Sequence, residues 1–123
     1  MNSQETRSLF IQYINTCNIA LSRHKDTLPY KQILELGEKF VGGKNIAVEV
    51  YRDDPHRPVD LYTIRLNDGN LDVVAYEKQD VAMEWKVKET YLKKVVENSA
   101  EFIAHPERLE WEWLKSRIGL RQT

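Results

Sequence analysis

The residues that could perform acid–base or nucleophilic chemistry are few and far apart in this chain. Histidine titrates near neutral pH, which suits it to proton transfer, and the chain contains three, His24, His56 and His105. Each falls in an expected loop or helix end, with no positioned partner close by in the sequence. Asp53 and Asp54 are adjacent in a proline-bounded segment, which is typical of a solvated turn rather than of a metal site or an acid–base pair. The sequence therefore contains no catalytic signature.

The single cysteine excludes two further kinds of chemistry. Cys17 cannot form an internal disulfide, and no Cys/His spacing in the chain fits a zinc site. Because Cys17 lies on the apolar face of an expected helix, we predict a buried and unreactive thiol. We expect neither a metal nor a cofactor.

The tryptophans are the most informative residues of the chain. Trp85, Trp111 and Trp113 all fall in the last third of the sequence. Trp85 alternates with polar residues on a strand, so we expect it to point into the core. Trp111 and Trp113 lie on two different stripes of the expected final helix, and a helix packed on one side cannot easily bury both. One of them is expected to face a ligand cavity or a partner protein. The alternative is that the buried face of this helix is wide and that one tryptophan is half exposed at its border.

Hydrophobic periodicity predicts an α+β fold of two layers, with one domain over residues 1–123. A helical period predicts two N-terminal helices, the first beginning near Ser3 and the second ending at Gly42-Gly43. A period of two then predicts a four-stranded antiparallel β-meander over residues 46–51, 59–66, 71–76 and 81–88. Two C-terminal helices follow, the first with a break near Asn98-Ser99 and the second running from Pro106 to Gly119.

The turn at Asp68-Gly69 predicts the register of the central hairpin, because this dipeptide favours a two-residue type I′ turn. Counting outward pairs apolar residues on one face: Leu66 with Leu71, Ile64 with Val73, and Tyr62 with Ala75. The other face pairs Arg65 with Asp72, and a turn over residues 78–80 would place Lys86 beside Asp72. We therefore expect one face of the sheet to form the core and the other to be at least partly in solvent.

Composition and charge favour a soluble cytoplasmic domain. The chain is 41% hydrophobic and 30% charged, with a formal net charge of −1, so it has no long-range field that would attract nucleic acid. It contains neither an apolar run of the ~20 residues that a membrane span needs nor an N-terminal signal-peptide pattern. We expect no nucleic-acid partner and no membrane span.

From about residue 45 to residue 106 the order of elements resembles a sterol-carrier-protein-type lipid-binding domain. The resemblance is carried by the strand at 46–51, the hairpin at 61–69, and the strand at 82–87 that leads directly into the helix at 91–96. Members of that family hold a fatty acyl chain or a sterol in an apolar tunnel between sheet and helices. The chain differs from the family in having residues 106–114 in place of its last strand, and two N-terminal helices instead of one.

The resemblance and the surplus of tryptophans predict a non-enzymatic protein that binds an apolar small molecule between sheet and helices. The expected ligand-binding residues are Met83, Trp85, Phe102, Leu109 and Trp113, and Trp111 is expected to bind a partner. One alternative is a small homodimer or accessory interaction module. Another is a small enzyme of the ketosteroid-isomerase type, with Asp53 or His56 as a base in an apolar pocket.

Overall fold

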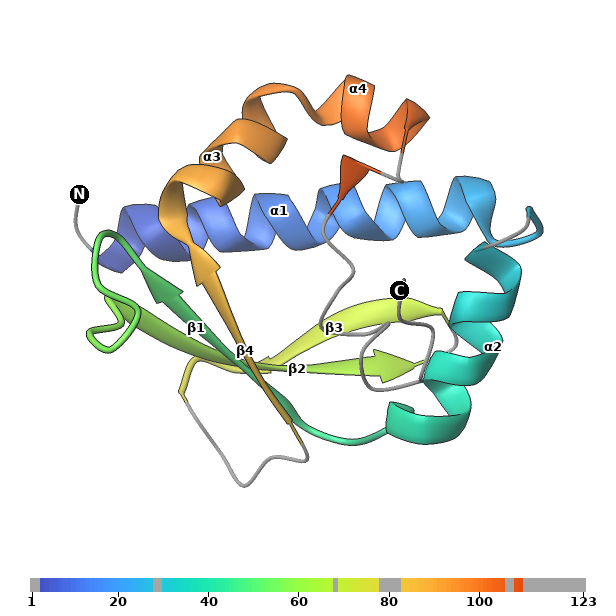
Figure 1. Cartoon of the computed structure of the whole chain (residues 1–123), viewed down its shortest axis with the longest axis horizontal. Helices are drawn as coiled ribbons and strands as arrows, with labels where there is room; N and C mark the ends of the chain where they lie inside the picture. Colours follow the sequence, from blue (N-terminus) through green and yellow to red (C-terminus); the bar gives the residue numbers. More distant parts are fainter. Residues whose placement is uncertain (1–2, 28–29, 68, 78–82, 106–107, 110–123) are drawn as a thin grey trace, which may run out of the picture.

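In the computed structural model, the described residues are 3–27, 30–67, 69–77, 83–105 and 108–109. Within them, two helices come first in the chain, four strands that form one sheet come next, and two further helices follow (Figure 1). The preceding helices are α1 (Ser3–His24) and α2 (Tyr30–Val41). The strands are β1 (Ile46–Tyr51), β2 (Asp60–Asn67), β3 (Asn70–Ala75) and β4 (Met83–Lys88). The following helices are α3 (Glu89–Glu97) and α4 (Ser99–Ala104).

Helix α1 owes its position to one apolar stripe. Its buried side chains recur at helical spacing and belong to the hydrophobic core: Phe10, Tyr13, Ile14, Cys17, Ala20 and Leu21. The stripe lies on the sheet, where the ring of Phe10 stacks on that of Tyr62 from β2, with centroids 4.1 Å apart. Helices α1, α3 and α4 lie on the same side of the sheet (Figure 1).

The prediction of an antiparallel meander is wrong for the last strand. The strand order is β3-β2-β1-β4, and β4 pairs with β1 in parallel, so the sheet is mixed. Lys86 is consequently the partner of Glu49 on β1 and does not lie beside Asp72 on β3. Arg65 and Asp72 are cross-strand partners as predicted, but the expected row of Arg65, Asp72 and Lys86 does not form.

The pattern of β4 alone could not specify its neighbour, because alternation determines a face of the sheet and not an edge. Next to β1, Trp85 lies opposite Val48, and Val87 lies opposite Val50. Both of those β1 valines, Val48 and Val50, are fully buried. The parallel pairing thus places the apolar face of β4 beside the most deeply buried strand.

The predicted hairpin register is confirmed near its turn and shifts further out. Leu66 pairs with Leu71 and Ile64 pairs with Val73. An irregularity between Thr63 and Ile64 then makes Ala75 the partner of Thr63, whereas Tyr62 was expected.

The outer face of the sheet is less open than the sequence indicates. Glu84, Lys86 and Asp72 are exposed there, as predicted. Thr63, however, is fully buried, and its Oγ1 donates a 2.7 Å hydrogen bond to the carbonyl oxygen of Glu77. The chain that leaves β3 therefore covers part of this face.

The C-terminal helices differ in layout from the prediction. Helix α3 ends at Asn98, whose backbone leaves the helical conformation (φ −120°, ψ 33°) and whose side-chain amide donates to the carbonyl oxygen of Lys94. The predicted break near Asn98-Ser99 is confirmed, and α3 and α4 both fall within the first of the two predicted helices. Of the second, expected from Pro106 to Gly119, only residues 108–109 belong to the described part of the chain.

Candidate binding site

Three aromatic side chains meet where α1, β4 and α3 come together, and we call them the aromatic cluster. The ring of Tyr13 on α1 lies 6.0 Å from the ring of Trp85 on β4 and 6.0 Å from the ring of Tyr91 on α3. Tyr13 is buried, whereas Trp85 and Tyr91 are half-buried although both pack against the core. The cluster is thus an extension of the core that reaches the surface.

Local sequence explains how each ring reaches this position. Tyr13 belongs to the buried stripe of α1, and Trp85 faces inward by the alternation of β4. Helix α3 begins directly after β4, and Tyr91 lies in its first turn. The ring of Tyr91 therefore lies close to the strand that carries Trp85.

Tyr13 of the cluster and its neighbour Cys17 are held in their neutral forms. Burial raises the pKa of the Tyr13 hydroxyl well above its usual range, and neighbouring Cys17 and Tyr91 raise it further. Burial raises the pKa of the Cys17 thiol to about 12, although its hydrogen bond with Tyr13 acts in the opposite direction. The predicted burial of Cys17 is confirmed, since its side chain is 1% exposed.

Of the other expected ligand-binding residues, some are buried in the core and some lie outside the described part of the structure. Phe102 and Leu109 are buried in the hydrophobic core. Met83 begins β4 as the partner of Ile46, but its side chain is outside the described part of the structure. Trp111 and Trp113 lie outside the described residues, so their expected roles stay predictions.

A cavity of about 490 Å³ opens beside Phe102, between α3 and α4. Among the described residues that line it, Phe102 is apolar and the others are polar: Lys94, Asn98, Glu101 and Arg108. Arg108 forms an ion pair with Glu101 at this opening. Trp85 does not line this cavity, so the cavity and the aromatic cluster are separate features.

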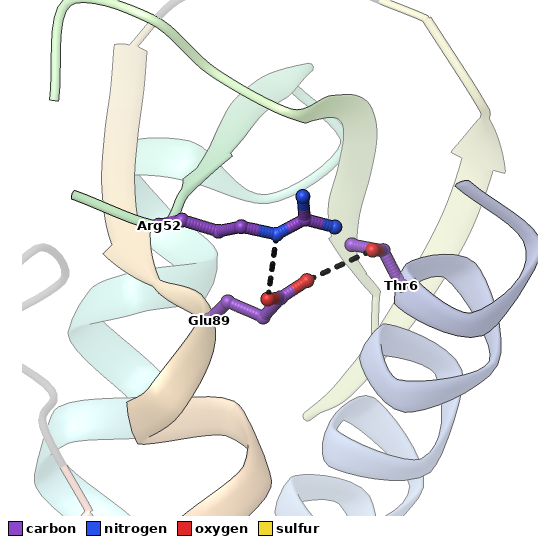
Figure 2. A network of polar contacts seen from close by, with 3 residues as sticks. All are labelled: Thr6, Arg52 and Glu89. Carbon is purple, nitrogen blue, oxygen red and sulfur yellow. Dashed lines mark hydrogen bonds and ion pairs between the residues drawn. The ribbon is translucent and has the colours of Figure 1, made fainter. Parts of the chain in front are cut away.

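A buried polar network, which the sequence analysis missed, lies at the start of α3 (Figure 2). Its central residue, Glu89, is 7% exposed. Oε1 of Glu89 accepts from Nε of Arg52 at 3.0 Å, and Oε2 accepts from Oγ1 of Thr6 at 2.9 Å. Glu89 begins α3, Arg52 directly follows β1, and Thr6 lies in the first turn of α1. An acidic residue at a helix start is a recognisable signal, but nothing local indicates partners 37 and 83 residues away.

A second group of polar side chains surrounds Tyr62 at the same end of the sheet. The Tyr62 hydroxyl donates a 2.7 Å hydrogen bond to Oδ2 of Asp60. Burial raises the pKa of Tyr62 well above its usual range, and the contact with Asp60 raises it further. The guanidinium of Arg7 lies 4.1 Å from the centre of the Tyr76 ring, a cation–π contact. Tyr62 is therefore held neutral and serves as a hydrogen-bond donor.

The residues that a ketosteroid-isomerase-type site would need as bases are on the surface. Asp53 and His56 are both exposed, in the loop between β1 and β2. His24 contacts the carbonyl oxygen of Ile103 through Nε2 at 2.9 Å, which joins the end of α1 to α4. The described residues contain no group of three or more His, Cys, Asp or Glu side chains that could hold a metal ion.

No helix in the described part of the chain combines the length and the apolar character that crossing a membrane requires. Comparison of the chain with protein-family models, with curated proteins and with solved structures finds no match.

Proposed function

We propose that this protein binds an apolar small molecule, such as an acyl chain or a sterol-like lipid, between the sheet and the helices without catalysing a reaction. The aromatic cluster carries the proposal, because Trp85 and Tyr91 are half-buried although they pack directly against the buried Tyr13. Large aromatic side chains at the border of a core offer apolar area that a ligand can cover.

The chemistry around the cluster is consistent with an apolar ligand. The core-facing neighbours of Trp85 are apolar, namely Val87 on the same strand and Val48 and Val50 on β1. Burial keeps Tyr13 and Cys17 neutral, so these two side chains present no charge to a ligand there. Burial of apolar ligand surface contributes about 25 cal/mol per Å². A ligand that covers Trp85 and Tyr91 therefore binds mainly through the hydrophobic effect.

Native mass spectrometry of the freshly purified chain, before and after incubation with oleate or cholesterol, tests the proposal. We expect one lipid-sized adduct per chain, either co-purified or acquired during incubation. If only the mass of the unliganded chain were found under every condition, the proposal would be wrong. A dimer without an adduct would favour the alternative of a self-associating interaction module.

A further inference from the structure

We propose that Thr6, Arg52 and Glu89 form a latch that holds α3 closed over the aromatic cluster, an inference that rests on the proposed binding function. The latch joins the first turn of α1, the residue that follows β1 and the first residue of α3 (Figure 2). Each of the three residues comes from a different part of the fold, so the latch fixes the position of α3 relative to both α1 and the sheet.

The latch holds Glu89 from two sides. Both carboxylate oxygens of Glu89 are engaged, Oε1 by Arg52 and Oε2 by Thr6. The N-cap residue Lys88 contributes no side-chain cap to α3, so these contacts secure the start of the helix. A buried carboxylate is tolerated only while it is paired or hydrated. The first turn of α3 can therefore leave its place only if Glu89 exchanges both partners for water.

The latch is placed to control access to the aromatic cluster. Glu89 lies between Trp85 on β4 and Tyr91 on α3, at the junction where the strand becomes a helix. A rotation of α3 about this junction would carry Tyr91 away from Tyr13 and uncover the inner side of Trp85. Besides Glu89, the buried residues of α3 are Leu92 and Val95, which belong to the core, so the movement we propose is that of the first turn, which carries Tyr91.

The test is the rate of ligand exchange in a Glu89→Gln variant, which keeps the shape of the side chain but removes the ion pair with Arg52. We expect oleate to associate and dissociate about tenfold faster, the factor that corresponds to about 1.4 kcal/mol, with its Kd changed by less than about threefold. Stopped-flow tryptophan fluorescence measures both rates. Asn18→Ala serves as the control, because it removes a polar contact of α1 with β3, away from the latch.

Two outcomes would overturn the latch: unchanged rates in E89Q, or an equal acceleration in N18A. Hydrogen exchange of the full chain provides a readout that needs no ligand. We expect E89Q to lower the protection of the amides of residues 91–95 selectively, and a uniform loss over the chain would contradict the latch. If the wild-type protein binds no oleate, the proposed function fails, while hydrogen exchange still decides whether Glu89 holds α3.

Discussion

At the scale of single residues, Asn18 on α1 binds both backbone groups of one residue of the sheet. Asparagine on the polar side of an amphipathic helix is expected to face water. Here its amide nitrogen donates to the carbonyl oxygen of Leu71 at 2.9 Å, and its Oδ1 accepts from the Leu71 N–H at 2.7 Å. Leu71 belongs to β3, an edge strand of the described sheet. The side chain thus occupies backbone groups that an edge strand would otherwise offer to another chain.

Asn18→Ala is expected to lower the free energy of unfolding by about 1–3 kcal/mol, because it leaves both backbone groups of the buried Leu71 without this partner. Asn15→Ala is the matched control, since Asn15 is exposed on the same helix and the two substitutions gain equal helix propensity. Urea unfolding of both variants measures the difference. Equal stabilities would show that the contact with Leu71 contributes nothing.

The raised pKa of the buried Cys17 thiol predicts that the protein becomes less stable as the pH rises above 9. Burial raises the pKa of its thiol from an ordinary value of 9.0 to about 12 in the folded protein. Between these values the unfolded chain loses a proton that the folded chain keeps, so folding becomes less favourable as pH rises. The contribution is about 1.4 kcal/mol for each pH unit above 9. Unfolding experiments between pH 8 and pH 10 should show a steeper decline for the wild type than for Cys17→Ala, and parallel declines would refute the assignment.

At the scale of elements, the parallel pairing of β4 with β1 is the feature that decides the fold. Glu49 and Lys86 are cross-strand partners in this pairing, on the outer face of the sheet. Lys86→Glu would therefore place two carboxylates side by side and cost about 0.2–1 kcal/mol. The double variant with Glu49→Lys should recover that loss.

Asp72→Lys is the control for this pairing, because an antiparallel meander would have put Lys86 beside Asp72. It should not rescue Lys86→Glu, since β3 and β4 lie at opposite edges of the sheet. Rescue by Asp72→Lys and not by Glu49→Lys would mean that the strand order is wrong. A double-mutant cycle in urea measures both couplings.

At the scale of the whole molecule, sequence reasoning succeeded where the information is local. The hydrophobic period located β1, and the Asp68-Gly69 turn gave the pairing of Leu66 with Leu71. It failed for the neighbour of β4, because alternation looks the same at either edge of a sheet. The register shift at Thr63 also has no signal in the pattern of apolar residues.

In the candidate site too, local features were predictable from the sequence and long-range contacts were not. The inward position of Trp85 was predictable from the alternation of its strand, and the burial of Cys17 was predictable from its helix. The contacts of Glu89 were not, because its partners Arg52 and Thr6 are distant in the chain and no pattern links them. Charged residues at a helix start are common, and three-dimensional packing alone distinguishes a buried one from an exposed one.

Calorimetric titration of oleate into the wild type, Trp85→Ala and Ile19→Ala tests the central claim most directly. Ile19 is 44% exposed on α1 and outside the aromatic cluster, so its variant controls for the loss of apolar surface elsewhere. We predict one site per chain in the wild type and in I19A, and an affinity at least about tenfold weaker in W85A, a loss of about 1.4 kcal/mol. Equal affinities in all three proteins, or no binding by the wild type, would contradict the account.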